Sequence, residues 1–183
     1  MKEKLNLTSN PILKLLSKIA IPSMTGSLFQ TLLNVVDTFF AGKISPEALA
    51  ALAKAFPLYF IIIAAGIGIV AACNSLIANA LGSSNRILAS IYSYHSLIYA
   101  FFLSIAITLI ATFFSYDLYK IMGSTHESIM LSKKYTDIIF LGTIFFLILT
   151  AFNSNLCAQG DTKTYRNVLI VGVIFNIILN PIF

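Results

Sequence analysis

The sequence predicts an all-α fold, a polytopic membrane bundle of about five transmembrane helices. Of its residues, 58% are hydrophobic and 10% are charged, whereas a soluble domain carries roughly a quarter charged residues. The mean hydropathy is +0.89. Long apolar runs recur along the chain, and each is close to the roughly 20 residues that a helix needs to cross a bilayer. We therefore expect a single membrane domain over residues 1–183, surrounded by lipid.

The first predicted span covers residues 19–42 and contains one charged residue, Asp37. Pro22 lies near its N-terminal end, where a proline inside a helix predicts a kink. The run is too long for the apolar region of a signal peptide, and no A-x-A-like cleavage site follows it at a suitable distance. We therefore expect this segment to be retained as a spanning helix.

The second predicted span covers residues 46–81 and ends where the sequence Gly-Ser-Ser-Asn begins at Gly82. Such a helix would be on the order of 50 Å long, so it should tilt, bend or protrude from the bilayer. Small residues at Ala64, Gly68 and Ala72 are spaced four apart, which predicts close packing of another helix on that face.

The remaining spans are expected at residues 87–114, 135–158 and 167–183. The connections are short except for Ser115–Lys134, where we expect a longer amphipathic link that contains a turn. The fifth run is still apolar at the last residue of the sequence and has no flanking charge there. This pattern predicts a fifth helix that is cut short or barely complete.

Lys and Arg residues predict how the chain is oriented. Five spans place the two ends of the chain on opposite sides of the membrane. With the N-terminus in the cytoplasm, seven Lys and Arg residues fall inside and five fall outside, a modest positive-inside excess. The inner residues are Lys2, Lys4, Lys14, Lys18, Arg86, Lys163 and Arg166. The outer residues are Lys43, Lys54, Lys120, Lys133 and Lys134. We expect a multi-pass protein of the cell membrane, whose net charge of +5 reflects orientation and not nucleic-acid binding.

A polar stripe leads along the first span to Asp37. Ser23, Ser27, Gln30, Asn34 and Asp37 are spaced by 4, 3, 4 and 3 residues, which places them on one face of a helix. A lone acid inside a spanning helix costs about 2.5–3.5 kcal/mol on insertion scales. Because no Lys or Arg occurs near its depth, a proton or a sodium ion is the partner that we expect for this carboxylate.

Helical rise predicts the depth of these side chains. Asp37 precedes Lys43 by six residues, or roughly 9 Å, and Asn180 follows Arg166 by 14 residues, or roughly 21 Å. Across a core of about 30 Å, the two side chains fall at similar depth. We therefore expect one polar cluster in the outer half of the membrane, made of Gln30, Asn34, Asp37, Asn176 and Asn180. The alternative for the amides is that they only form hydrogen bonds between helices.

Patterns typical of catalysis do not occur in this sequence. No His, Ser and Asp residues fall at a shared depth, and no phosphate loop or metal-ligand spacing occurs. We therefore expect neither an enzyme nor a bound cofactor. Tyr135 and Asn153 share a stripe of the fourth span, but they are 18 residues or roughly 27 Å apart. Both can line a cavity only if that cavity extends across the membrane.

Four segments resemble the multidrug and toxic compound extrusion (MATE) family. They are VDTFFAG at residues 36–42, EALAAL at 47–52, QGDTK at 159–163 and NIILNP at 176–181. Each motif alone is weak, but the set occurs in the family's order and spacing and covers essentially the whole chain. The resemblance implies about twelve helices in two six-helix lobes around a central cavity. This chain matches the first five helices of the first lobe, so its partners would include the missing C-terminal helices.

The resemblance also implies a function and a site. Members are cation-driven antiporters that export drugs, mostly organic cations. The acid of the first helix belongs to the proton or sodium site of the lobe, so Asp37 is also the expected ligand of a sodium ion. Gln30, Asn176 and Asn180 fall at positions of that network, whereas Tyr135 and Asn153 fall near the cavity. The family commonly has Asp where this chain has Asn180, and an amide cannot titrate.

Two alternatives remain open from the sequence. One is a flippase for lipids or lipid-linked sugars in the same superfamily. Such proteins often line their cavity with arginines, whereas here Arg occurs only at Arg86 and Arg166, both near loops. The other is a truncated membrane remnant that does not transport. The choice between proton and sodium coupling is open as well.

Overall fold

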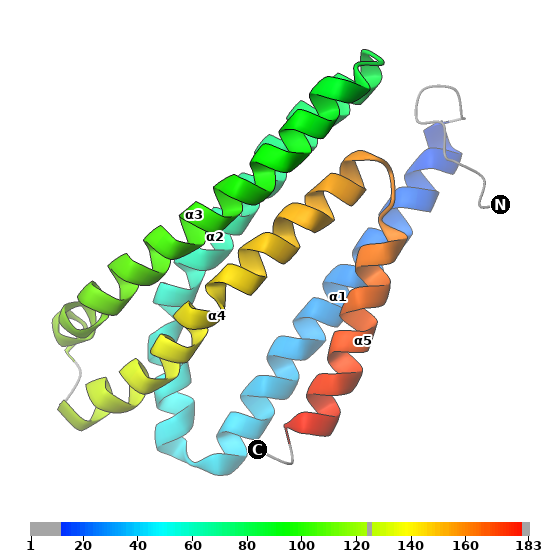
Figure 1. Ribbon diagram of the computed structural model, residues 1–183. Helices are drawn as coiled ribbons and strands as arrows, with labels where there is room; N and C mark the ends of the chain where they lie inside the picture. The colour runs from blue at the N-terminus through cyan, green and yellow to red at the C-terminus, as the bar shows by residue number, and fades with distance from the viewer. Residues whose placement is uncertain (1–11, 124–125, 181–183) are drawn as a thin grey trace. The chain divides into compact units, whose positions relative to one another are not determined.

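Five α-helices with short connections make up the part of the chain that the structure, a computed structural model, describes: residues 12–123 and 126–180 (Figure 1). Lys2, Lys4 and residues 181–183, which entered the charge count and the fifth predicted span, lie outside the described residues, as does the side chain of Lys14. The helices are α1 (Ile12–Ile44), α2 (Pro46–Gly82), α3 (Arg86–Ile121), α4 (His126–Ala158) and α5 (Lys163–Leu179).

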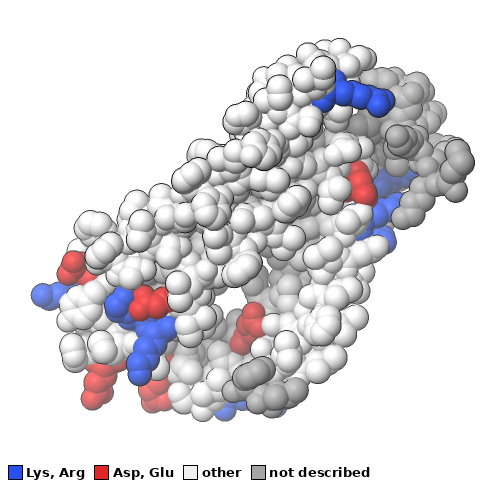
Figure 2. Space-filling model, in the orientation of Figure 1, with Lys and Arg blue, Asp and Glu red and all other residues white. Residues whose placement is uncertain are grey.

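Four of these helices are long and apolar enough to cross a membrane, namely α1 to α4. On the face shown in Figure 2, most of the surface is uncharged and the charged side chains gather in a few small groups. This pattern suits a surface that faces lipid, where charges are costly. In the described part of the chain α5 has 17 residues, so a fifth crossing stays a prediction.

The predicted long connection over Ser115–Lys134 is wrong. α3 continues to Ile121 and α4 already begins at His126, so most of that segment is helical. The error arose because hydropathy marks where a helix meets water, whereas backbone hydrogen bonding continues into polar turns outside the bilayer. For the same reason α1 begins at Ile12, seven residues before the predicted span, and it continues through Pro22.

Local sequence explains where α2 and α3 begin. The Ser45 hydroxyl oxygen accepts a hydrogen bond from the Ala48 backbone N–H at 3.1 Å, and Pro46 occupies the first turn of α2. Asn85 Oδ1 accepts a hydrogen bond from the Leu88 N–H at 3.0 Å at the start of α3. These caps satisfy backbone donors that a helix start leaves unpaired. α2 ends at Gly82, one residue beyond the predicted span and at the start of the predicted turn.

The chain divides into two compact units, each described here by itself. Residues 1–40 and 156–183 form the first unit, and residues 41–155 form the second. The first unit therefore contains most of α1 together with α5. The second contains α2, α3 and most of α4. The expectation of one membrane domain over the whole chain stays a prediction.

In the second unit, hydroxyl groups link α4 to both of its neighbours. Thr108 Oγ1 of α3 donates a hydrogen bond to the backbone oxygen of Phe140 at 2.7 Å. Ser154 Oγ donates to Asn74 Oδ1 of α2 at 3.1 Å. Between α2 and α4 the contacts Lys54–Ser128 and Asn74–Ser154 have residue numbers that increase together. Between α3 and α4 the numbers change in opposite senses, from Ser96–Asn155 to Ser115–Lys133. Thus α4 runs parallel to α2 and antiparallel to α3.

A small-residue face of α2 does pack, but it is not the predicted one. Ala64, Gly68 and Ala72 are exposed, and a Cβ built on Gly68 would meet nothing within 4 Å. Gly66 is buried instead, and a Cβ there would lie 3.3 Å from Cε1 of Phe146 on α4. α2 carries small residues on more than one face, so their spacing alone could not say which face a neighbour covers.

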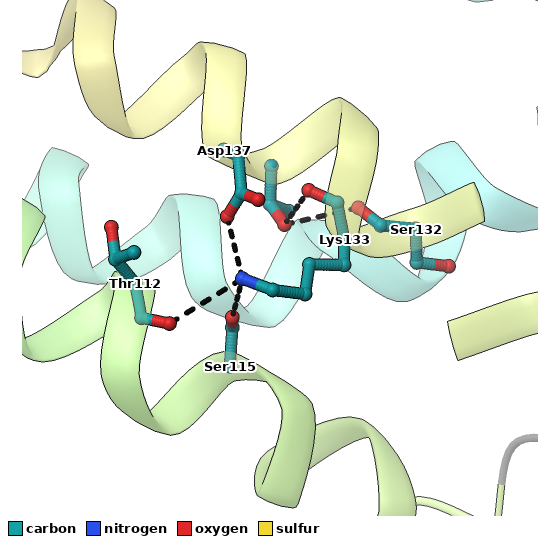
Figure 3. Close-up of polar contacts among 6 residues, drawn as sticks. Thr112, Ser115, Ser132, Lys133 and Asp137 are labelled. Atoms are coloured by element: carbon teal, nitrogen blue, oxygen red, sulfur yellow. Dashed lines mark hydrogen bonds and ion pairs between the residues drawn. The ribbon is translucent and has the colours of Figure 1, made fainter. Parts of the chain in front are cut away.

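A lysine of α4 whose contacts sequence reasoning did not predict, Lys133, joins α3 and α4 (Figure 3). Lys133 Nζ lies 2.9 Å from Asp137 Oδ1, one turn further along α4. The same ammonium donates to Ser115 Oγ and to the Thr112 carbonyl oxygen of α3, both at 3.4 Å. Lys133 therefore connects two helices as well as neutralising an acid on its own helix.

Candidate functional site

Asp37 lies in a hydrogen-bonded set between α1 and α5 in the first unit. Its Oδ1 accepts hydrogen bonds from Nδ2 of Asn176 at 2.7 Å and from Nδ2 of Asn180 at 3.0 Å. Asn180 Nδ2 also donates to Asn176 Oδ1 at 3.1 Å. We call these three residues the Asp37 contact. The depth count predicted that they would meet, and their proximity is confirmed.

The local sequence positions the two amides at the carboxylate. Asn176 and Asn180 are one helical turn apart, so both project from the same face of α5. The start of α5 is fixed by Asp161, whose Oδ1 and Oδ2 accept hydrogen bonds from the backbone N–H and the hydroxyl of Thr164 at 3.1 and 2.6 Å. The face of α5 that carries both amides is the one that contacts Asp37 of α1.

The Asp37 carboxylate remains accessible in this arrangement. Its side chain is exposed, whereas Asn176 and Asn180 are half-buried. Within residues 12–123 and 126–180 it makes no ion pair. Hydrogen bonds to an ionised acceptor are about twice as strong as those between neutral groups. Two N–H donors on a single oxygen atom therefore suit a carboxylate that is ionised, with its second oxygen free to meet a cation.

Gln30 and Asn34 are not part of the Asp37 contact. Gln30 Oε1 instead accepts a hydrogen bond from the Tyr165 hydroxyl at 3.3 Å. Asn34 is exposed, and its backbone oxygen accepts a hydrogen bond from Thr38 Oγ1 at 2.7 Å. The polar residues of α1 therefore share one face of the helix, but Gln30 and Asp37 have different hydrogen-bond partners on α5.

Sequence reasoning missed the residues of α5 that meet the earlier part of α1. A Cβ built on Gly26 would lie 3.5 Å from Leu169 Cδ1 and 3.7 Å from Cδ1 of Tyr165. Tyr165 and Leu169 precede Asn176 by 11 and 7 residues, so they lie on the same face of α5. That spacing was a signal that could have identified both, once Asn176 was assigned to the face toward α1.

Tyr135 and Asn153, the predicted cavity residues, both lie on α4 in the second unit. Tyr135 is 39% exposed and Asn153 is half-buried. They are far apart along the helix, as the count of residues between them predicted. Their role in lining a cavity stays a prediction.

Comparison with known proteins places these features in a family. The sequence model of the MatE family matches residues 22–182, which include Asp37, Asn176 and Asn180. The chain belongs to the MATE family. The match begins at Pro22, within α1, and includes the rest of that helix, α2 to α5 and the Asp37 contact.

Two curated relatives of this MATE chain differ in what their names say they transport. A protein named FAD transporter, from Shewanella oneidensis, is 28% identical over the whole chain and is covered to 40% of its own length. A protein named probable multidrug resistance protein YoeA, from Bacillus subtilis, is 29% identical over 91% of the chain and is covered to 36%. This chain thus spans about two fifths of the length of these relatives.

A solved structure supports the helix arrangement. The crystal structure of MATE in complex with MaD5 superposes with a TM-score of 0.92 at 28% identity. The superposition covers all of this chain and 42% of that one. The all-α membrane fold and the resemblance to the MATE family are therefore confirmed.

Proposed function

We propose that this chain forms part of a cation-coupled antiporter that exports drugs and other xenobiotic organic cations from the cell. The observation that carries this proposal is the Asp37 contact, a single carboxylate held by two amides between two helices of a membrane protein. Membership of a family that includes multidrug transporters supports the cargo class. In this proposal the helices of the second lobe come from outside the 183 residues.

The proposed mechanism uses the charge of Asp37. While the carboxylate is ionised, it attracts a cationic cargo into the cavity. When a proton or a sodium ion binds, the charge is neutralised and the cargo loses its counter-ion. Protonation also weakens the amide hydrogen bonds, since these are stronger to an ionised acceptor. The resulting shift in the position of α1 favours the conformation in which the lobes face the cytoplasm.

The side chains accept a proton as they are oriented here, whereas a sodium ion would require a rearrangement. A proton needs only the free carboxylate oxygen. A sodium ion prefers several oxygen ligands, and hard cations are bound by carboxylate and amide oxygens. As oriented here, both amides direct N–H groups toward Asp37, so sodium would require Asn176 and Asn180 to turn their oxygen atoms toward it. Transport into vesicles with an imposed sodium gradient or an imposed pH gradient would distinguish the two ions.

Substitution of Asp37 tests the proposal. We expect Asp37→Asn to reduce ion-coupled export to the background of empty vesicles, because the amide cannot exchange charge, while membrane insertion is unchanged. The assay requires a transport-competent protein that carries this segment, such as a chimera with the rest of the Bacillus subtilis relative. Asp117→Asn, which neutralises an exposed acid near the end of α3, is the matched control. Drug export by Asp37→Asn equal to that of the parent would refute the proposal.

A second candidate cargo is a flavin dinucleotide. The similarity that favours it is to the Shewanella oneidensis protein named FAD transporter, which matches the chain over its full length. Competition would decide, because FAD would inhibit drug export by a flavin transporter at low concentration and leave a drug-specific transporter unaffected. A lipid-linked sugar flippase is less well supported, since Arg86 and Arg166 lie in the first turns of α3 and α5, at the ends of these helices and not near their middles.

A further inference from the structure

A half-buried lysine of the second unit, Lys54 of α2, is held by a neutral group and not by an acid. Its ammonium donates a hydrogen bond to Ser128 Oγ of α4 at 2.6 Å, and both side chains are half-buried. Lys133, by contrast, lies 2.9 Å from the carboxylate of Asp137. A charge that leaves water and gains only a neutral hydroxyl keeps much of its desolvation cost. An anion bound at Lys54 would remove that cost.

The other acids of the second unit do not supply the missing negative charge. Glu47 lies in the first turn of α2, seven residues or roughly 10 Å before Lys54. Asp117 and Glu127 are exposed, and neither forms an ion pair within residues 41–123 and 126–155. Asp137 is already paired with Lys133. The charge of Lys54 is therefore available to an anion from outside the chain.

The donors at Lys54 and Ser128 suit an anion that has several oxygen atoms. An ammonium carries three N–H donors, and Ser128 accepts a hydrogen bond from one of them. The Ser128 hydroxyl accepts this bond through its oxygen and can still donate its own hydrogen. Lysine is a common ligand of phosphate groups, and hydrogen bonds between ionised partners are stronger than neutral ones. One phosphate group can thus be bound by both side chains.

The pair lies where the apolar part of α4 meets a polar environment. Ser128 precedes Tyr135, at the start of the fourth predicted span, by seven residues or roughly 10 Å. Lipid headgroups and water are expected at this level.

An apolar side of α4 continues from Ser128 into the predicted span. Leu131, Tyr135 and Ile138 follow Ser128 at helical spacing and are 42%, 39% and 72% exposed. One turn beyond Ile138, a Cβ built on Gly142 would meet nothing within 4 Å. A molecule whose phosphate binds at Lys54 therefore finds an open apolar surface beside it.

We propose that Lys54 and Ser128 bind the phosphate group of an amphiphilic molecule, whose apolar or aromatic part lies along Leu131, Tyr135 and Ile138. Two sources have this chemistry. One is a cargo that joins a phosphate to an aromatic ring system, as a flavin nucleotide does, and the other is an anionic phospholipid of the bilayer. The proposal goes beyond the coupling role of Asp37 and does not depend on it.

Binding to the 183-residue chain in detergent micelles tests the proposal, with native mass spectrometry to count the bound molecules at each probe concentration. The soluble probes are flavin mononucleotide and riboflavin, which differ only in the phosphate group. The lipid probes are phosphatidylglycerol and phosphatidylcholine, which differ in the net charge of the headgroup. Lys54→Met removes the charge and keeps the aliphatic stem, whereas Lys54→Arg keeps the charge. Lys134→Met removes an exposed charge of α4 and is the matched control.

We expect the parent to bind flavin mononucleotide more tightly than riboflavin, or phosphatidylglycerol more tightly than phosphatidylcholine. Lys54→Met should weaken that binding by about tenfold or more, because it removes a hydrogen bond between charged groups. Ser128→Ala removes a neutral donor and should weaken it about two- to tenfold. Lys54→Arg and Lys134→Met should bind as the parent does.

The two probe pairs also identify the source of the phosphate. A preference for the nucleotide supports a cargo site, and a preference for phosphatidylglycerol supports a lipid site. Equal binding within both pairs, or equal losses in Lys54→Met and Lys134→Met, would overturn the proposal and leave the role of Asp37 untouched. Circular dichroism checks that each variant folds, and Ser128→Ala tests the same contact if Lys54→Met does not fold.

Discussion

Asn180 determines how Asp37 is held, because an amide donates a hydrogen bond where a carboxylate would repel. Its Nδ2 lies 3.0 Å from the Asp37 carboxylate and 3.1 Å from the oxygen of Asn176. The single carboxylate and the two amides are thus linked by hydrogen bonds into one set. The family resemblance implies an aspartate at this position, which would place two negative charges within hydrogen-bonding distance.

Asn180→Asp should change the pH dependence of export. Two carboxylates at such a separation cannot both ionise easily, so the pair retains one proton that the parent site does not. We expect the pH midpoint of ion-coupled export in the chimera to move to higher pH, with export still driven by a proton gradient. Asn180→Ser is the control, since it removes the amide without adding a charge. An unchanged midpoint in Asn180→Asp would show that this position does not contact the titrating group.

At the scale of helices, the second unit depends on close packing of α2 against α4. Gly66 faces Phe146, Leu147 and Thr150, with the nearest atom 3.3 Å from the position of an added Cβ. Gly68 lies two residues further along and meets nothing within 4 Å. The two glycines therefore provide a matched pair for testing which face of α2 is covered.

Gly66→Val should destabilise the protein by about 1–3 kcal/mol, because added carbons must displace Phe146 in a packed interface. Gly68→Val should change the free energy of unfolding by less than about 0.5 kcal/mol, as expected of an exposed position. Unfolding monitored by circular dichroism in detergent micelles measures both. Equal losses in the two variants would mean that α4 does not pack where the structure places it.

Lys133 should stabilise the α3–α4 contact more than its charge alone suggests. It is part of an ion pair that is 27% and 38% exposed, which by itself contributes little. Its two further bonds reach Ser115 and the Thr112 carbonyl of α3. We expect Lys133→Met, which keeps the aliphatic stem, to cost about 1–2 kcal/mol.

The neighbouring Lys134→Met is the control for Lys133→Met, because Lys134 is exposed on α4. It removes the same charge from the same end of the helix. Chemical unfolding of the two variants side by side would separate the bonds to α3 from the effect of net charge. If both variants lose the same stability, the interhelical bonds contribute nothing measurable.

At the scale of the whole molecule, the orientation in the membrane is a prediction from charge. The excess of Lys and Arg on one side predicts that the α2–α3 turn faces the cytoplasm and the α3–α4 turn faces outward. Single cysteines at Ser83 and Met122, both exposed, report on the two turns. Cys73 and Cys157 are first replaced by alanine.

A membrane-impermeant maleimide added to intact cells should label Met122→Cys and leave Ser83→Cys unlabelled. After the cells are permeabilised, both should react, which controls for accessibility. Labelling of Ser83→Cys alone in intact cells would reverse the orientation. In that case the Asp37 contact would lie toward the cytoplasm, and the direction of the proposed ion movement would have to be reversed.

Much of the candidate site could be predicted because each residue of a helix adds a constant rise, so that depth in the membrane follows from a count of residues. Counting residues from Lys43 and from Arg166 placed Asp37 and Asn180 at one height, and the structure brings them to 3.0 Å. Gln30 could not be assigned a partner in this way. Its contact with Tyr165 depends on the reach and direction of two long side chains, which residue spacing does not specify.

The sequence by itself determined the all-α membrane fold, the turn at which α2 ends and the height at which Asp37 meets α5. These are local or additive properties, set by hydropathy, turn residues and a constant rise per residue. Tertiary structure alone decided that α2 packs through Gly66 and not through Gly68, and that Lys133 bridges to α3. Faces of one helix with similar composition are equivalent until a neighbouring helix covers one of them, so no pattern within a single segment could have made that choice.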